Sequence, residues 1–354
     1  MSERGGASHR VMVFGAGNIG MYVGGLLAGA GAQVTFVGRP RLLDEITTDG
    51  LHLTDLEGAE RHVAPDRFRV ATEPDDVANA DLVLVTVKSG ATADAARAVA
   101  GRIRPGTLVI SLQNGIGNDT VLRDILPSCV VLPGMVLFNV IRRDRAHYHR
   151  GTEGGIAVPD DPALLGWLDL FERAGLPLQR HDDLRSVQWA KLLLNLNNPV
   201  NALSGLPLRD ELADRDYRRC VAMAQKEALE VMHRARIHPA RLTALPSELM
   251  ASVLTVPTWL FRLLAGRVLA IDPLARSSMA DDLAAGRRTE ITWLCGEVVD
   301  LGAMTGVATP VNQRLIQLIN QAEQGDQRRW SGQELLAELR KAAESGRAGS
   351  ARSR

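Results

Sequence analysis

The chain has 354 residues, 45% of them hydrophobic, and its 41 basic and 41 acidic side chains give a formal net charge of zero. Two domains are expected, because a single hydrophobic core rarely keeps growing in chains of this length. The balanced charge argues against a nucleic-acid-binding protein, since such proteins carry a basic surface. A small-molecule function is the expectation that remains.

The cysteines and the apolar segments indicate the cellular location of the protein. Cys129, Cys220 and Cys295 are odd in number and far apart, so neither a disulfide framework nor a metal site is predicted. The N-terminus MSERGGASHR lacks the apolar core of a signal peptide, and the stretch 256–271 is too short and too basic to span a membrane. We therefore expect a cytoplasmic protein without membrane contacts, and a buried or partly amphipathic helix at 256–271.

The first half of the chain alternates short β-branched runs with helical segments. The predicted strands are VMVF, QVTFV, DLVLVTV, TLVISL and VVLPGMV, and helices are expected near 19–30 and 92–102. This alternation predicts an α/β fold with a Rossmann-type, doubly wound parallel sheet that is covered by helices on both faces. The segment HYHRGTEGGIAVP is expected to add antiparallel strands at the edge of that sheet.

The second half of the chain is predicted to be an all-α domain, because helical patterns follow one another from about residue 183 to residue 324. Asp182 or Asp183 is a suitable N-cap for its first helix, whose apolar stripe is formed by Leu184, Val187, Ala190 and Leu194. The predicted domains are 1–183 (dinucleotide-binding), 184–330 (helical, catalytic) and 331–354 (a terminal helix and a disordered basic tail, ESGRAGSARSR).

A glycine-rich loop follows the first predicted strand and opens the first predicted helix. Glycines at these positions permit a tight turn and a close approach of the backbone to a pyrophosphate, which the helix N-terminus attracts. The placement between strand and helix makes the motif specific for a dinucleotide. The predicted cofactor-binding residues here are Gly15, Ala16, Gly17, Asn18, Ile19 and Gly20.

Three further residues are predicted at strand ends, where ligands bind in open α/β sheets. The second strand ends in Gly38 and Arg39, where an NAD-binding protein usually has an acidic residue. An arginine suits a 2′-phosphate, so NADPH is favoured over NADH, and Arg41 is a second candidate for the same role. Lys88 and Asn114 end two other strands and are expected to line the same crevice, the alternative being solvated surface positions.

The stretch QWAKLLLNLNNPVN, residues 188–201, places polar groups on a leucine-rich helix. Lys191, Asn195 and Asn198 have i, i+4, i+7 spacing and are expected to share one helix face. Reduction of a ketone needs a proton donor, and a partly buried lysine can supply it. Pro199 cannot donate to the carbonyl of Asn195, so a local bend is expected. The alternative is a snorkelling lysine beside core amides.

Taken together, these motifs resemble the ketopantoate reductase (2-dehydropantoate 2-reductase) family over nearly the whole chain. The matching segments are GAGNIG, VTVK, QNGIG, AKLLLN with NPVNAL, SSM followed by RRTEI, and GVATPVN. The resemblance implies NADPH-dependent reduction of a small 2-keto acid, ketopantoate, to (R)-pantoate in pantothenate biosynthesis. It also implies a 6-phosphogluconate-dehydrogenase-like C-terminal domain, a monomer or homodimer, no metal, Asn114 beside nicotinamide and substrate, and Lys88 near the cofactor.

The resemblance also assigns roles in the second domain. It implies that Lys191 is the general acid, and that Glu290 hydrogen-bonds the substrate hydroxyl, helps to orient the lysine and lies near the cofactor. Asn195 and Asn198 would bind substrate oxygens, and Ser278 would hold the substrate carboxylate. From the residues alone, Glu290 is only an acidic group at the start of a helix, with the preceding threonine as a possible cap.

Some features depart from the family pattern. The second asparagine usually lies eight residues beyond the lysine, whereas Asn198 lies at seven, so Asn201 is an alternative for its role. Thr292 and Cys295 stand where an acidic residue and an asparagine are common. An insertion around 246–275 is expected to cover the cleft or to form an interface.

Three other functions are alternatives. A β-hydroxyacid dehydrogenase also pairs a Rossmann domain with a lysine and an asparagine four residues apart, but Arg39 and the lack of a DAPVSGG-like segment speak against it. An NADPH-binding regulatory protein would not need Lys191, Asn114, Ser278 and Glu290 together. A paralogue that reduces another branched 2-keto acid stays open.

Overall fold

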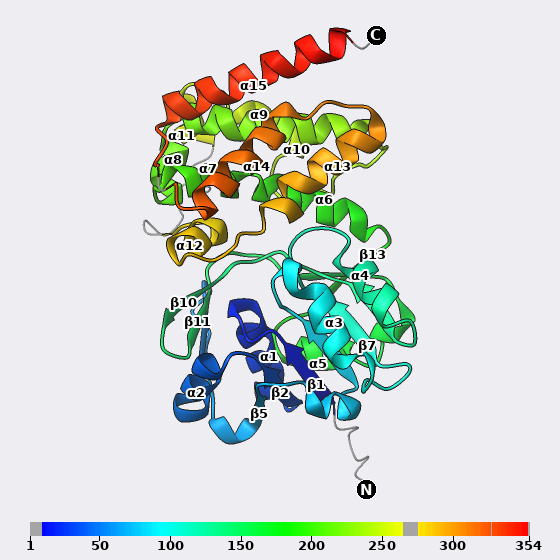
Figure 1. The fold of residues 1–354 in the computed structure, drawn as a ribbon. Helices are drawn as coiled ribbons and strands as arrows, with labels where there is room; N and C mark the ends of the chain where they lie inside the picture. Colours follow the sequence, from blue (N-terminus) through cyan, green and yellow to red (C-terminus); the bar gives the residue numbers. More distant parts are fainter. Residues whose placement is uncertain (1–8, 265–274, 327, 353–354) are drawn as a thin grey trace, which may run out of the picture. The chain divides into compact units, whose positions relative to one another are not determined.

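The computed structural model describes residues 9–264, 275–326 and 328–352. Two compact units make up the chain, Met1–Leu184 and Arg185–Arg354 (Figure 1).

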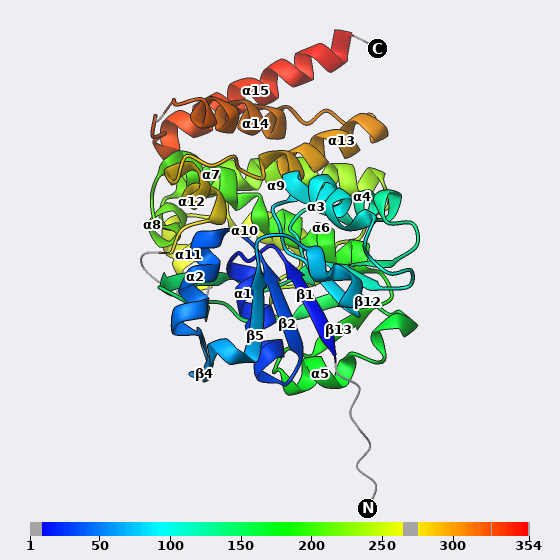
Figure 2. The same cartoon turned by 60° about the horizontal axis from the view of Figure 1, so that its bottom comes forward.

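The first unit is built on a six-stranded sheet in the order β5-β2-β1-β6-β7-β8, in which every pair of neighbours is parallel. Figure 2 shows β1, β2 and β5 side by side. The predicted doubly wound parallel sheet is confirmed. The strands are β1 (Arg10–Phe14), β2 (Gln33–Val37), β5 (Phe68–Ala71), β6 (Leu82–Val85), β7 (Leu108–Ser111) and β8 (Val130–Pro133).

Helices cover both faces of this sheet, because its strands are apolar on both sides. Val11 and Val13 of β1 belong to one core with Leu27 of helix α1 (Asn18–Gly29). Met12, between them, belongs to the opposite core with Val99 of α3 (Thr92–Ala100) and with residues of α4 (Asn118–Ile125). The remaining helices of this unit are α2 (Pro40–Asp49), α5 (Leu168–Arg173) and the 3-10 turns η1 (Pro65–Arg67), η2 (Asp75–Asn79), η3 (Ser89–Ala91) and η4 (Pro162–Leu164).

Two smaller sheets complete the first unit. One has the order β10-β11-β3-β4, and the other has the order β13-β12-β9. The strands of the first are β3 (Leu51–Asp55), β4 (Glu60–Val63), β10 (Val140–Asp144) and β11 (His147–Arg150). Those of the second are β9 (Met135–Val136), β12 (Ile156–Pro159) and β13 (Leu178–His181).

The expectation that HYHRGTEGGIAVP extends the main sheet is wrong. Its two strands, β11 and β12, lie in different small sheets, and each has one parallel and one antiparallel neighbour. The physical reason is burial: Tyr148 of β11 joins Leu51 and Leu53 of β3 in the core on the α1 side of the main sheet. Pairing with β3 buries this face, which an exposed sheet edge would not do.

The second unit is helical throughout, and its described residues contain no strand. Asp183 directly precedes its first helix, at the predicted cap position, and Leu184, Val187 and Ala190 of the predicted stripe are buried. Helix α9 packs against α15 (Figure 1). The helices are α6 (Leu184–Asn195), α7 (Asn197–Ser204), α8 (Leu208–Ala213), α9 (Arg215–Arg234), α10 (Ser247–Val253), α11 (Thr258–Leu264), α12 (Ser278–Ala284), η5 (Ile291–Trp293), α13 (Cys295–Thr305), α14 (Pro310–Glu323) and α15 (Gly332–Arg352).

Two segments of the second unit can be compared with their sequence predictions, the C-terminal tail and the stretch 256–271. Helix α15 continues to Arg352, so the disordered tail expected from residue 344 is not found over 344–352. Gly346 contributes to this result, because a Cβ there would lie 2.7 Å from Cγ of Pro310, and its absence lets α15 pack closely on the start of α14. Helix α11 is partly amphipathic, with Phe261 buried and Trp259 70% exposed. Residues 265–274, within the predicted insertion, lie outside the described residues.

Within the described ranges, every helix is too short or too polar to span a bilayer.

Candidate dinucleotide and catalytic sites

The glycine-rich loop is fixed by the ends of two strands. The amides of Gly15 and Ala16 both donate to the carbonyl of Val37, at the end of β2, over 3.0 and 3.1 Å. From the other side, the Thr86 hydroxyl, just after β6, donates to the carbonyl of Gly15 over 2.7 Å. The loop is therefore held in place by the protein alone. Thr86 was not singled out from the sequence, where a threonine in VTVK gives no distinct signal.

The glycines of the loop are required for different reasons. Gly15 has φ +117°, and a Cβ there would lie 2.4 Å from the amide nitrogen of Val87. A Cβ on Gly20 would lie 2.3 Å from the carbonyl oxygen of Gly15. Gly17 differs from both, because nothing lies within 4 Å of its Cβ position. This side of the loop is open to a ligand that approaches the backbone closely.

The first amides of α1 are available to an anion. The helix begins at Asn18 without a side-chain cap, and no described hydrogen bond has the amide of Asn18 or Ile19 as its donor. Such amides, together with the helix dipole, attract phosphate groups. The Asn18 side chain is engaged elsewhere, because its Nδ2 donates to the carbonyl of Val140 over 3.1 Å. Asn18 therefore offers its backbone to a cofactor.

Arg39 lies beside this loop because of the residue before it. A Cβ on Gly38 would be 2.4 Å from Cβ of Ala16, so glycine is needed for β2 to end this close to the loop. Arg39 occupies the N-cap position of α2 and is exposed. The nearby Arg41 is also exposed and lies 3.9 Å from Glu45. Arg39 is thus the better placed of the two cations for a phosphate next to the glycine loop.

The structure brings together the loops that carry Lys88 and Asn114. The hydroxyl of Ser89 donates to the carbonyl of Asn114 over 2.8 Å, and Nδ2 of Asn118 donates to the same carbonyl over 2.9 Å. Lys88 is exposed, whereas Asn114 is partly buried. Both loops follow strands of the main sheet at their carboxyl ends, as predicted.

Buried polar side chains behind these loops hold the loops in place. These side chains were not predicted from the sequence. Gln113 Nε2 donates to the carbonyl of Val87 over 3.1 Å and to the hydroxyl of Thr92 over 2.7 Å. That hydroxyl lies 2.8 Å from Oδ1 of Asn118. The available signal was the polar run QNGIGN directly after an apolar strand. A network in which each member is satisfied makes its surroundings rigid, so both loops are preorganised.

In the second unit, the segment with the predicted catalytic lysine is not one helix. Lys191 and Asn195 lie on α6, which ends at Asn195, whereas Asn198 lies on α7, which begins after a turn residue, Leu196. The expectation of one continuous helix is therefore wrong, although Leu196 has αR backbone angles and its amide donates to the carbonyl of Leu192 over 3.0 Å. The predicted bend at Pro199 is the reason, because proline offers no amide to the carbonyl four residues earlier and is accepted in the first turn of a new helix. The shared face of Lys191, Asn195 and Asn198 stays a prediction.

Lys191 lies in an apolar environment. It is partly buried between buried neighbours, Ala190 and Leu192. Burial lowers the pKa of the Lys191 ammonium from 10.5 to about 8. Desolvation has this effect because it disfavours the charged form. A lysine of this kind is charged at neutral pH and gives up its proton more readily than an exposed lysine.

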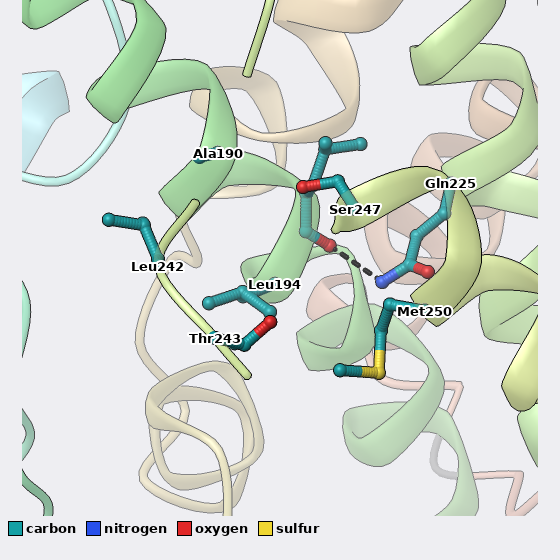
Figure 3. A pocket seen from close by; sticks show the side chains of 8 residues that line it. Ala190, Leu194, Gln225, Leu242, Thr243, Ser247 and Met250 are labelled. Atoms are coloured by element: carbon teal, nitrogen blue, oxygen red, sulfur yellow. Dashed lines mark hydrogen bonds between the residues drawn. The ribbon is translucent and has the colours of Figure 1, made fainter. Parts of the chain in front are cut away.

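The side of α6 formed by Ala190 and Leu194 packs on other helices. Figure 3 shows this side facing Gln225 of α9 and Met250 of α10, with Nε2 of Gln225 donating to a carbonyl of α6 over 3.0 Å. The cavity here measures about 10 Å³, which is space for one water molecule at most. The packing fixes the rotation of α6, and the cavity is too small to admit a substrate.

The structure brings α7 and the start of α12 together. The Ser277 hydroxyl donates to the carbonyl of Asn198 over 3.3 Å, and the Ser277 amide donates to Oδ1 of Asn201 over 2.9 Å. Asn201 is fully buried, and its Nδ2 also donates to Glu211 over 2.8 Å. Asn201 is therefore engaged within the fold, which favours Asn198 for substrate contact. Ser278 follows as an exposed first residue of α12.

Glu290 lies at the start of η5 and is buried, with 8% of its surface exposed. Glu290 itself, and not the expected Thr289, occupies the N-cap position of η5. The hydroxyl of Thr289 accepts from the amide of Ile291 over 3.3 Å. The same hydroxyl donates to Glu323 of α14 over 2.7 Å. Thr289 thus ties the Glu290 segment to α14. The proximity of Glu290 to Lys191 stays a prediction.

A parallel sheet that leads into an uncapped glycine loop, followed by a helical unit, defines a Rossmann-type chain with a separate all-α domain. Comparison with protein families identifies it further. Residues 11–162 match the family described as "Ketopantoate reductase PanE/ApbA", and residues 183–323 match its C-terminal part. The chain belongs to the ketopantoate reductase family, as its motifs predicted.

Individual relatives agree with this assignment. The "2-dehydropantoate 2-reductase" of Halobacterium salinarum is 33% identical over 320 residues, which cover 89% of this chain and 99% of that protein. The protein of the same name from Archaeoglobus fulgidus is 28% identical over 324 residues, 89% of this chain and 98% of that one. A solved structure of a "PanE/ApbA family ketopantoate reductase" from Ralstonia eutropha has a TM-score of 0.76 and 29% identity, covering 89% and 98% of the two chains.

Proposed function

We propose that the protein is an NADPH-dependent 2-dehydropantoate 2-reductase, which reduces ketopantoate to (R)-pantoate in pantothenate biosynthesis. The observation that carries this proposal is Lys191, a partly buried lysine whose pKa is lowered to about 8, at the position of the AKLLLN motif. The names of the full-length relatives support the same substrate. We also propose a cytoplasmic location, which the three free cysteines favour.

The first unit has the groups that NADPH requires. The amides of Asn18 and Ile19 would hold the pyrophosphate, on the side of the loop that Gly17 leaves open. Arg39 would pair with the 2′-phosphate, since a guanidinium matches phosphate geometry. Asn114 would contact the nicotinamide end, and Lys88 would lie near the cofactor. When bound, the reduced nicotinamide supplies the hydride that adds to the keto carbon of the substrate.

The second unit would hold the substrate. We assign substrate oxygens to Asn195 and Asn198, and the substrate carboxylate to Ser278, whose position next to α7 supports the grouping. Glu290 would accept a hydrogen bond from the substrate hydroxyl and help to orient Lys191, and it would lie near the cofactor.

Lys191 would supply the proton. As the carbonyl carbon accepts the hydride, its oxygen gains negative charge, and the ammonium of Lys191 stabilises that charge and transfers one proton to the oxygen. The products would be the alcohol, the oxidised cofactor and a neutral lysine, which regains its proton from water. A pKa of about 8 suits this role, because the group is mostly protonated at neutral pH and yet acidic enough to donate.

The test is NADPH oxidation by the purified protein, followed by absorbance, with ketopantoate and with a panel of other branched 2-keto acids. We expect ketopantoate to be the preferred substrate. NADPH binding without oxidation by ketopantoate would disprove the substrate assignment, and preference for another acid would identify a paralogue. Lys191→Ala should abolish turnover while NADPH binding is retained. Lys226→Ala, on an exposed site of α9, is the matched control and should behave as the unmodified protein.

A further inference from the structure

Four of the eight histidines lie close together in the four-stranded sheet β10-β11-β3-β4 of the first unit. The strand register places His147, His52 and His62 directly opposite one another on β11, β3 and β4. Two residues along the same strands, His149 and Glu60 occupy the next row. Side chains two residues apart on a strand point to the same face, so all five lie on one face of this sheet.

Three of these side chains have their ligating atoms close together. Nε2 of His52 lies 2.7 Å from Oε1 of Glu60, and Nε2 of His62 lies 3.2 Å from the same oxygen. The potential ligand atoms of all three residues lie within 4.8 Å of one another. The rings of His52 and His62 are stacked, with centroids 4.3 Å apart, so both present their Nε2 atoms to the same carboxylate.

The other two histidines support this group from behind. The ring of His147 stacks on that of His52, with centroids 4.0 Å apart. Thr54 Oγ1 lies 2.9 Å from Nε2 of His147 and 2.8 Å from Nδ1 of His149. Thr54 therefore forms hydrogen bonds with both of these rings. His52 is held between two parallel rings, which fixes its plane.

The opposite face of the sheet provides a rigid base. Leu51, Leu53 and Val63 on β3 and β4 are each at most 3% exposed and belong to the hydrophobic core that includes α1. A shift of register would move these side chains out of the core, so the positions of the strands are strongly specified. The three candidate ligands are thus presented by two strands that cannot easily move apart.

We propose that His52, Glu60 and His62 form a binding site for a divalent transition-metal ion of the zinc type. Two imidazole nitrogens and one carboxylate oxygen are ligands that Zn²⁺ accepts, and a tetrahedral ion would place them about 3.4 Å apart. The observed separations of 2.7 and 3.2 Å need only a small opening of the side chains. Binding would replace the hydrogen bonds between the two imidazole Nε2 atoms and Glu60.

The surface position of the site determines how it would behave. His62 and Glu60 have side chains that are 70% and 58% exposed, whereas that of His52 is 30% exposed. Water can therefore complete the coordination, and the ion can exchange with solvent. Because β4 is an edge strand of this sheet, a bound ion would also tie this edge to β3. None of the three candidate ligands is among the residues assigned to the cofactor or the substrate, so the proposal does not depend on the proposed reaction.

The test uses the full chain without a histidine tag, freed of metal by a chelator. Zn²⁺ is then titrated in and followed by calorimetry, and Co²⁺ is used as a spectroscopic probe. We expect one ion per chain, a melting temperature that rises with Zn²⁺ concentration, and a Co²⁺ spectrum with nitrogen and oxygen ligands. His62→Ala and Glu60→Gln should weaken binding by more than the ~10–100-fold typical of changes around a metal site.

His238→Ala is the matched control, since it removes an exposed histidine of the second unit and should leave binding unchanged. Glu60→Gln keeps the size of the side chain, so its effect does not depend on altered folding. The proposal is overturned by the absence of stoichiometric binding, by equal binding in the His62→Ala and His238→Ala variants, or by a Co²⁺ spectrum with thiolate charge transfer, which would place the ion on a cysteine.

Discussion

Replacing Lys191 with methionine should make the protein more stable and inactive at the same time. The pKa of Lys191 is lowered from 10.5 to about 8 by burial. Near pH 7 the lysine is charged in both the folded and the unfolded state, and the folded state bears the cost of desolvation. At about 1.4 kcal/mol for each pH unit, this difference corresponds to ~3 kcal/mol. Methionine has a similar length and no charge, so Lys191→Met removes this cost.

The pH dependence provides a second measure of the same effect. A lysine whose folded-state pKa is lowered binds fewer protons in the folded state between about 8 and 10.5, so the stability of the unmodified chain rises with pH in this window. The advantage of Lys191→Met should therefore be largest below pH 8 and shrink toward pH 10.5. Urea unfolding at several pH values measures it, and Lys226→Met on an exposed site serves as control.

The Lys191→Met substitution should lower turnover although it raises stability. Loss of a general acid typically lowers the rate about 10²–10⁴-fold, so Lys191→Met should have almost no NADPH oxidation with ketopantoate. A variant that is less stable than the unmodified chain near pH 7 would refute the reasoning about burial. A variant that keeps full turnover would refute the assignment of Lys191 as proton donor.

Four further predictions follow from the same structure. The reduction rate at limiting substrate should fall as pH rises above about 8, because Lys191 must be protonated; a flat profile to pH 9.5 would contradict this. Arg39→Ala should weaken NADPH about tenfold or more in fluorescence titration and leave NADH nearly unchanged, whereas equal effects would remove the 2′-phosphate role. Burial raises the pKa of Glu211 to about 8, so stability should fall as pH rises from about 4.5 to 8, and Glu211→Gln should flatten that dependence in thermal melts. Asn118→Ala, which removes a donor to the Asn114 carbonyl, should cost about 1–3 kcal/mol in urea unfolding and weaken NADPH binding, and unchanged binding would count against preorganised loops.

The main sheet was predictable because its central strands are buried on both faces. The runs that form β1, β6 and β7 are apolar except for Arg10 and Ser111 at their ends, a pattern typical of parallel strands between two layers of helices. Strand β5 was not predicted, since FRVA has two exposed positions and lies at the sheet edge. The small sheet with β3 and β4 was missed for a similar reason, because its outer face is polar and its pairing joins segments far apart in the chain.

In the candidate site, the types of side chain were predictable and their arrangement was not. The lysine and asparagines of the second unit were found from helix spacing and motifs. The hydrogen bond that Asn201 accepts from Ser277 was not predictable, because it joins residues 76 positions apart. The same applies to Gln113, Thr92 and Asn118, whose polar network forms only when two loops meet. Tertiary contacts of this kind leave no periodic signal in a sequence.

The turn at Leu196 has a consequence for how this segment can change during evolution. One residue inserted into a continuous helix turns everything beyond it by about 100° and would move every following side chain to another face. Between α6 and α7 the helix is already interrupted, so a gain or loss of one residue can be absorbed in the turn. A chain with the second asparagine eight residues beyond the lysine, the spacing expected from the family pattern, could thus keep the same two helices as this chain, which has seven. The turn is a position where length can vary while Lys191 and Asn195 remain in place.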